Sequence, residues 1–113
     1  PAESIDSLDG DFDAALIMRS WNHLEDPARV LAMLHAKLAP SGKLVVVDNV
    51  AFALARSEAQ TKRAMGTRAV FEHYRNDTSA MARTQIEAAG FRIDDEWAVS
   101  PSTSNQWVLF ASK

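Results

Sequence analysis

Hydrophobic residues in the first half of the chain form two short runs separated by one amphipathic stretch. Ala14–Met18 is a continuous apolar run, and Leu44–Val47 is a second one that is rich in β-branched residues. Runs of this length are typical of strands that are covered on both faces. Between them, leucine residues recur at helical spacing, which predicts an amphipathic helix over Pro27–Ala39.

This helix has its own start and stop signals. Asp26 is a favourable N-cap, Pro27 fits the first helical position, and Pro40-Ser41-Gly42 predicts a tight turn before the second run. A strand, a helix and a strand within so short a span form a βαβ crossover, in which the two strands are parallel. Exposed active-site groups in such sheets lie beyond the carboxyl ends of the strands, which here are Arg19–His23 and Asp48–Phe52.

The third quarter of the chain contains one irregular stretch and one well-marked helix. Ala51–Arg75 has an interrupted helical pattern and is predicted to be mostly helical. A helix over Ser79–Ala89 has Asp77 or Thr78 as its cap and ends at Gly90, because glycine favours the left-handed backbone that follows a helix.

The last quarter of the chain predicts two strands that pair antiparallel. Apolar and polar residues alternate over Phe91–Val99, Ser100–Asn105 is rich in turn residues, and Trp107–Ala111 is apolar. Trp97 and Trp107 are expected to serve core or cross-strand packing. No repeat or domain boundary interrupts residues 1–113, which are therefore predicted to form a single domain.

Composition narrows the class of protein. The 113 residues are 47% hydrophobic, carry a net charge of -3 and include no cysteine. A mildly acidic chain gives no electrostatic reason to expect nucleic acid or an anionic membrane as a partner. The apolar runs are too short to cross a bilayer, no signal-peptide pattern is present, and the lack of cysteine agrees with a reducing compartment. These features predict a soluble, cytoplasmic protein.

Four short strings, in this order and spacing, resemble the second half of the class I S-adenosylmethionine-dependent methyltransferases. FDAAL at residues 12–16 resembles the family's SFDAV entry to its fourth strand, and NHLEDP at 22–27 resembles the HHLPDP that follows it. LAPSGKL at 38–44 resembles the LKPGGRL turn, and IEAAGF at 86–91 resembles LLEAAGF before the sixth strand. The resemblance covers nearly the whole chain.

The resemblance implies an α/β fold with a partial Rossmann-like sheet. The chain would supply the family's strands four to seven in the order 4-5-7-6, with the last strand antiparallel and helices flanking the sheet. It would thus form the C-terminal half of a methyltransferase fold. The first residue, Pro1, is compatible with removal of an initiator, a cleaved tag or a cut from a longer protein.

The implied cofactor is S-adenosylmethionine, but most of its expected anchors are missing from the sequence. No G-x-G-x-G triplet occurs among the four glycines, and the ribose-binding acidic residue of the second strand has no counterpart. Ala2-Glu3-Ser4 resembles the family's DAESL segment near the adenine, with Pro1 in place of the aspartate. Close backbone approach and a carboxylate supply much of the polar binding, so the chain alone is predicted to bind the cofactor weakly or not at all.

The resemblance also assigns candidate site residues after the first strand. His23 is the candidate catalytic base that takes a proton from the acceptor, although a capping or packing histidine is the simpler alternative. The candidate cofactor contacts are Ala2, Glu3, Arg19, Ser20 and Trp21. Trp21 has the alternative of covering the core, and Arg19 that of a solvated side chain balancing Asp11 or Asp13.

The candidate acceptor contacts are Asn49, which follows the second strand, and His73 and Tyr74 in the segment that varies within the family. The alternative for the latter two is an ordinary amphipathic helix. Asp48 and Asn49 are adjacent in sequence and do not make a metal site, because hard cations need several converging oxygen ligands. No metal is assigned.

Two functional hypotheses follow, and a third, an unrelated α/β domain, is weaker. The first is an enzyme part that transfers a methyl group to an unknown small-molecule acceptor, with the fragment alone inactive. The second is a non-catalytic methyltransferase-like module that assembles through its open sheet edge. Ala14–Met18 would be that edge, and it contains no charge or proline to prevent strand addition. A dimer or larger species through Ala14–Met18 is therefore predicted.

Overall fold

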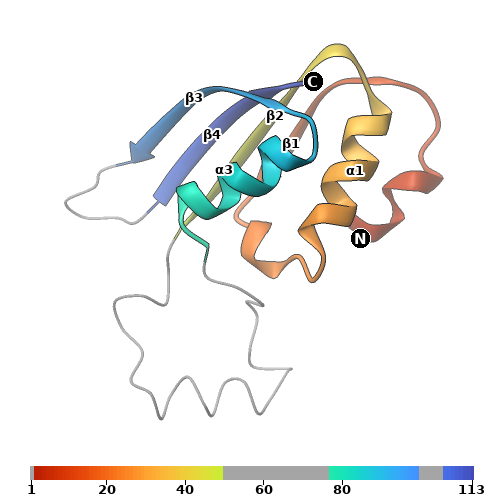
Figure 1. Cartoon of the computed structure of the whole chain (residues 1–113). Coiled ribbons are helices and arrows are strands. Elements are labelled where there is room, and N and C mark those ends of the chain that lie inside the picture. Colours follow the sequence, from red (N-terminus) through yellow and green to blue (C-terminus); the bar gives the residue numbers. More distant parts are fainter. Residues whose placement is uncertain (1, 50–76, 100–105) are drawn as a thin grey trace, which may run out of the picture.

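One mixed sheet of four strands organises the computed structural model, which describes residues 2–49, 77–99 and 106–113. The strands are β1 (Phe12–Met18), β2 (Leu38–Asn49), β3 (Arg92–Val99) and β4 (Gln106–Ser112), and they lie side by side in the order β1-β2-β4-β3 (Figure 1). In the family's numbering this order is 4-5-7-6, as predicted.

The strand directions also agree with the prediction. β1 pairs parallel with β2, placing Leu16 opposite Val45, whereas β4 runs antiparallel to both of its neighbours. The parallel pair is joined through α1 (Pro27–Lys37), which completes the βαβ crossover. The carboxyl ends of β1 and β2 therefore meet at the same edge of the sheet.

Capped helices cover one face of this sheet (Figure 1). The Asp26 carboxylate accepts a hydrogen bond from the Arg29 amide at the start of α1, and the Thr78 hydroxyl accepts one from the Met81 amide at the start of α3 (Ser79–Ala88). Two 3-10 helices, η1 (Ala2–Ser7) and η2 (Trp21–His23), flank β1 in sequence. No helix among the described residues is long and apolar enough to cross a membrane.

The helix-covered face of the sheet holds the hydrophobic core, and the opposite face of β1 is largely exposed. Ile17, Val46 and Leu109 are buried against the helices. In the opposite direction, Leu16 and Met18 are 58% and 60% exposed. The prediction that Ala14–Met18 is covered on both faces is thus wrong for this chain, because α1 and α3 lie on the same side of the sheet (Figure 1).

Some element boundaries differ from the predictions. The first helix ends at Lys37, because Leu38 enters β2 and pairs with Phe12. The predicted turn at residues 40–42 lies inside β2, where Ser41 has a φ of 64° and the β1–β2 register shifts. The segments Ala51–Arg75 and Ser100–Asn105 lie outside the described residues.

The end of α3 follows its sequence signal. Gly90 has a φ of 100°, a left-handed conformation that glycine adopts without steric cost. The amides of Gly90 and Phe91 donate to the carbonyls of Glu87 and Ile86, which satisfies the end of the helix. This turn directs the chain into β3.

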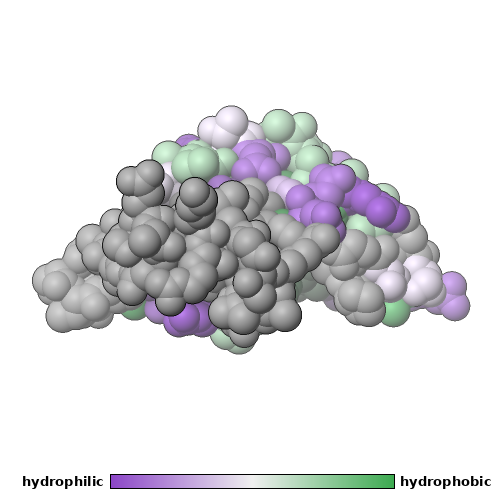
Figure 2. Space-filling model, turned by 90° about the horizontal axis from the view of Figure 1, so that it is seen from below, coloured by the Kyte–Doolittle hydropathy of each residue, from purple (hydrophilic) through white to green (hydrophobic). Residues whose placement is uncertain are grey.

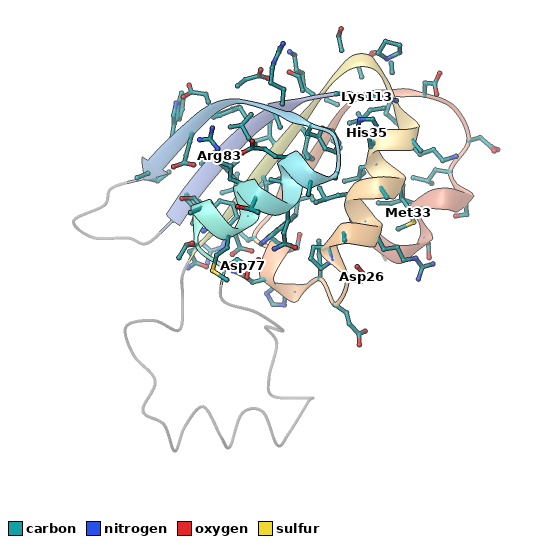
Figure 3. The ribbon with its side chains drawn as sticks, in the orientation of Figure 1. Asp26, Met33, His35, Asp77, Arg83 and Lys113 are labelled. Atoms are coloured by element: carbon teal, nitrogen blue, oxygen red, sulfur yellow. The ribbon has the colours of Figure 1, made fainter. Side chains whose placement is uncertain are left out.

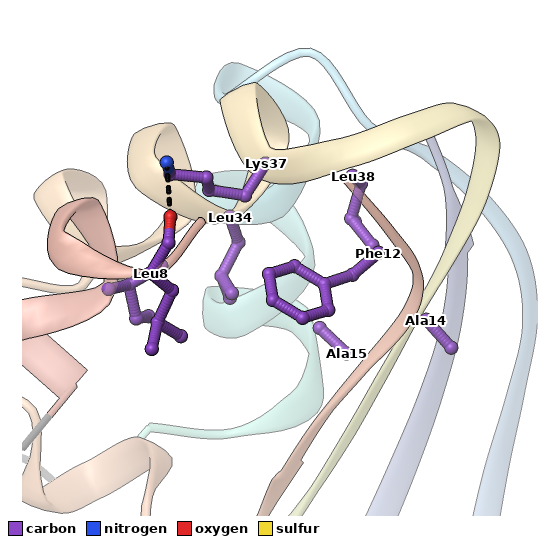
Figure 4. A pocket seen from close by; sticks show the side chains of 8 residues that line it. Leu8, Phe12, Ala14, Ala15, Leu34, Lys37 and Leu38 are labelled. Atoms are coloured by element: carbon purple, nitrogen blue, oxygen red, sulfur yellow. Dashed lines mark hydrogen bonds between the residues drawn. The ribbon is translucent and has the colours of Figure 1, made fainter. Parts of the chain in front are cut away.

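An apolar cavity of about 190 Å³ lies at the amino end of β1, between η1, β1 and α1 (Figure 4). The Phe12 ring lies beside Leu34 in this cavity, and the Lys37 ammonium donates to the Leu8 carbonyl at its rim (2.6 Å). The cavity is therefore at the opposite end of β1 from the carboxyl edge.

Candidate functional site

The carboxyl edge of β1 begins with a residue in an unusual backbone conformation. Arg19 has a φ of 56°, and its amide donates to the Val47 carbonyl at 2.7 Å, which extends the parallel ladder by one step. Such a conformation is uncommon for residues other than glycine. The side chains of Arg19 and Ser20 are exposed, and within the described part of the chain the Arg19 guanidinium has no ion pair with Asp11 or Asp13.

The two residues that follow Ser20, Trp21 and Asn22, are fully buried. Trp21 is 0% exposed, and its indole N–H donates to the Asp77 carboxylate at 2.9 Å. Asn22 is also 0% exposed, and its backbone N–H donates to the Asp48 carboxylate at 2.9 Å. The buried indole favours the interpretation that Trp21 covers the core.

Asp48 joins the end of β2 to this turn. One of its carboxylate oxygens accepts from the Asn22 amide, and the other accepts from the amide of Asn49 at 2.7 Å. The carboxylate is 1% exposed, so backbone N–H groups replace the water that it would lose on burial. This aspartate fixes the backbone of both edge segments.

Asp77 is the second acidic centre and lies just before α3 (Figure 3). Besides Trp21, the side-chain amide of Gln85 donates to its carboxylate at 3.0 Å. The indole N–H of Trp107, from β4, donates to its backbone carbonyl at 3.2 Å. Its own amide donates to the Asn22 side-chain oxygen at 2.8 Å. Asp77 therefore connects α3, β4 and the turn after β1.

We call this buried set of hydrogen bonds the edge network. Its members are Trp21, Asn22, Asp48, Asn49, Asp77, Gln85 and Trp107. Within it, the buried carboxylates of Asp48 and Asp77 accept hydrogen bonds from other residues of the chain. In the described residues, no three His, Cys, Asp or Glu side chains converge as a metal site would require.

The structure brings several predicted site residues to this edge. Arg19, Ser20, Trp21 and His23 follow β1, and Asn49 ends β2. His23 is half-buried in η2, where its amide donates to the Ser20 carbonyl at 3.1 Å. On the described part of the surface seen in Figure 2, hydrophilic and hydrophobic residues are intermixed.

The remaining predicted residues are described less fully. Ala2 and Glu3 lie in η1, and their side chains are outside the described set, as are His73 and Tyr74. η1 nevertheless borders the same region, because a cavity of about 140 Å³ is lined by Ile5 together with Ser20 and other residues after β1.

The sequence did not reveal the role of Asp77. From the sequence, Asp77 could equally have been the N-cap of the helix. The structure shows that Thr78 caps α3 instead. Gln85 occupies an ordinary helical position, and Trp107 was expected only to pack. The available sequence signal was the pair Trp21 and Trp107, because the indole N–H of a buried tryptophan usually needs a hydrogen-bond acceptor.

Solved structures that share this fold include methyltransferases and a cyclase. The [4+2]-cyclase SpnF matches the whole chain with a TM-score of 0.72 at 20% identity, and the chain covers 53% of it. A Burkholderia thailandensis 1,6-didemethyltoxoflavin-N1-methyltransferase with bound S-adenosylhomocysteine matches 96% of the chain (TM-score 0.68, 24% identity), which covers 48% of it. An S-adenosylmethionine-dependent methyltransferase from Mesorhizobium loti matches 96% of the chain (TM-score 0.69, 17% identity), which covers 66% of it.

The chain thus spans about half the length of the first two of these proteins. No curated protein matches it at a significant level. The family model described as a methyltransferase domain matches residues 2–96, which include β1, α1, β2 and α3. The chain therefore belongs to the methyltransferase domain family, in agreement with its resemblance to the class I S-adenosylmethionine-dependent enzymes.

Proposed function

We propose that this chain forms the acceptor side of a methyltransferase that uses S-adenosylmethionine and methylates a small molecule. The observation that carries the proposal is the edge network, which fixes the turn after β1 at the carboxyl ends of two parallel strands. Ligands of open α/β sheets bind beyond these ends. The 1,6-didemethyltoxoflavin methyltransferase supports a small acceptor, since its structure contains 1,6-didemethyltoxoflavin.

The residues present fit only part of a cofactor site. The carboxylates of Asp48 and Asp77 are buried and accept internal hydrogen bonds, so neither is available for the ribose hydroxyls. The sequence has no glycine-rich turn. We therefore propose that most of the cofactor affinity comes from outside these 113 residues, and that the chain alone is inactive.

The chemical demands on this chain are modest. S-adenosylmethionine, when bound, supplies an electrophilic methyl group, and transfer then depends mainly on alignment of the acceptor. We propose that His23 takes up the acceptor's proton, while the exposed Arg19 and Ser20 offer polar contacts to cofactor or acceptor. Asn49, His73 and Tyr74 are proposed to contact the acceptor. Ala2 and Glu3 remain proposed cofactor contacts, whereas the fully buried Trp21 is proposed to support the site by packing.

The coding sequence upstream of Pro1 tests the enzymatic proposal. A preceding strand with G-x-G-x-G, followed by an acidic residue at the end of the next strand, would support it. A start codon directly before Pro1 would contradict it, because the protein would then lack the glycine turn altogether.

The alternative is a non-catalytic interaction module, and one observation favours it. Among the described residues, no strand pairs with the outer edge of β1, and Leu16 and Met18 beside it are largely exposed. Bare strand edges invite pairing with another chain. We infer self-association through Ala14–Met18, which sedimentation measures. A cytoplasmic location remains a prediction from the sequence.

A further inference from the structure

We propose that Asn22 is a positioning residue that sets the placement of His23 and Asn49 relative to each other. Its side-chain amide nitrogen donates to the Asn49 carbonyl at 3.2 Å. Its side-chain oxygen accepts from the Asp77 amide at 2.8 Å. The side-chain amide of Asn22 therefore binds both Asn49 and Asp77, which precede and follow residues 50–76 in the sequence.

The backbone of Asn22 is fixed independently of its side chain. Its N–H donates to the Asp48 carboxylate, whose other oxygen accepts from the Asn49 amide. Asp48 and Asn22 thus connect the end of β2 to η2 by two separate routes. His23 follows Asn22 directly in η2, so its position depends on both routes.

Asparagine is well suited to this position because one planar group supplies both a donor and an acceptor. Alanine would remove both hydrogen bonds, and aspartate would keep the acceptor but lose the donor. The side chain is fully buried, so water would not readily replace the missing partners. Either substitution should change the edge locally.

The functional meaning of this positioning role depends on the proposed methyl transfer, in which His23 and Asn49 face the acceptor. The hydrogen-bond pattern itself does not depend on it. A test that follows the local structure of the 113-residue chain therefore separates the two ideas. Failure of the upstream sequence test would leave the positioning role of Asn22 intact.

The experiment compares Asn22→Ala with Phe91→Leu by amide hydrogen exchange and by NMR of the histidine rings. Phe91 is buried at the opposite end of the sheet, before β3, so its substitution lowers global stability without touching the edge network. We expect the exchange protection of the Asp77 amide, relative to the most protected core amides, to fall at least tenfold in Asn22→Ala only. The His23 ring resonances should move in the same variant only.

A third variant keeps the test decisive if Asn22→Ala does not fold. Asn22→Asp retains the oxygen that accepts from the Asp77 amide, so that amide should stay more protected than in Asn22→Ala or in the unfolded chain. The Asn49 carbonyl resonance should nevertheless shift, because its donor is gone. Equal Asp77 protection in Phe91→Leu and Asn22→Ala would overturn the proposal, as would His23 and Asn49 resonances that do not move in any folded Asn22 variant.

Discussion

The indole N–H of Trp21 donates a 2.9 Å hydrogen bond to the carboxylate of Asp77, a residue 56 positions away in the sequence. Trp107 donates its own indole N–H to the backbone carbonyl of the same aspartate. Trp21, which follows β1, and Trp107, in β4, thus both donate hydrogen bonds to Asp77, which lies just before α3. This convergence joins the helix-covered core to the carboxyl edge of the sheet.

Replacing Asp77 should destabilise the fold strongly. Asp77→Ala leaves the buried indole N–H of Trp21 and the partly buried side-chain amide of Gln85 without their carboxylate, and an unsatisfied buried group costs about 1–3 kcal/mol. We expect a loss of about 2–4 kcal/mol in the free energy of unfolding, measured by urea denaturation with tryptophan fluorescence. Asp26→Ala, which removes only the exposed cap of α1, should cost about 1 kcal/mol. Equal losses in the two variants would contradict the assigned role of Asp77.

Two glycines with similar backbone angles should respond differently to alanine. Gly10 and Gly90 have φ values of 90° and 100°, so both substitutions introduce backbone strain of about 1–2 kcal/mol. A Cβ on Gly90 would also lie 3.2 Å from the His35 ring, whereas one on Gly10 would meet nothing within 4 Å. Gly90→Ala should therefore lower the melting temperature more than Gly10→Ala, as calorimetry can measure. The reverse order would refute this account of the α3–β3 turn.

Ser112 should control the acidity of Asp94. The Ser112 hydroxyl accepts from the Lys43 ammonium at 2.8 Å and donates to Asp94. This hydrogen bond, followed by that of Arg92, lowers the pKa of Asp94 from its ordinary value of 3.8. A lowered pKa contributes stability above the ordinary pKa, and that stability is lost as the pH falls through the folded-state pKa.

In Ser112→Ala the Asp94 pKa should rise back toward 3.8, as a carbon-detected NMR titration would show. Ser79→Ala removes an exposed hydroxyl beside Glu96 instead and should leave Asp94 unchanged. An Asp94 pKa that is the same in all three proteins would show that Ser112 has no such influence.

Much of the fold could be predicted because its signals are local. The N-cap at Asp26, the glycine after α3 and the two β-rich runs act within a few residues, and the strand order followed from the family resemblance. The start of β2 at Leu38 was missed because Leu38 pairs with Phe12 before the backbone irregularity at Ser41, and no local pattern encodes that pairing. The exposure of one face of β1 was missed because a continuous apolar run does not indicate whether helices cover one face of the sheet or both.

The candidate site was predictable in place but not in detail. The carboxyl edge follows from the βαβ unit, so the location of Arg19, His23 and Asn49 at this edge could be predicted. Their functional roles stay predictions. The hydrogen bonds of Asn22 and Asp77 join residues 55 positions apart. No local pattern encodes such a pair, and only the folded chain brings its members together.

The exposed edge of β1 should drive self-association. Leu16 is 58% exposed on this strand, and a lysine there would place a charge on the edge, a common natural defence against strand addition. Leu16→Lys should shift the chain toward monomer in sedimentation velocity. Met81→Lys, at a residue that is 53% exposed on α3, should leave the distribution unchanged. A monomeric parent chain at high concentration would contradict the inference.

Titration calorimetry of S-adenosylmethionine into the 113-residue chain distinguishes a partial cofactor site from a complete one. The central claim is that these residues form the acceptor side of a methyltransferase and hold few of the cofactor's anchors, since the glycine turn is missing and the edge carboxylates bind Asn22 and Trp21. We expect no measurable heat, or a dissociation constant near the millimolar range, about -4 kcal/mol. A low-micromolar dissociation constant, about -8 kcal/mol, would contradict it.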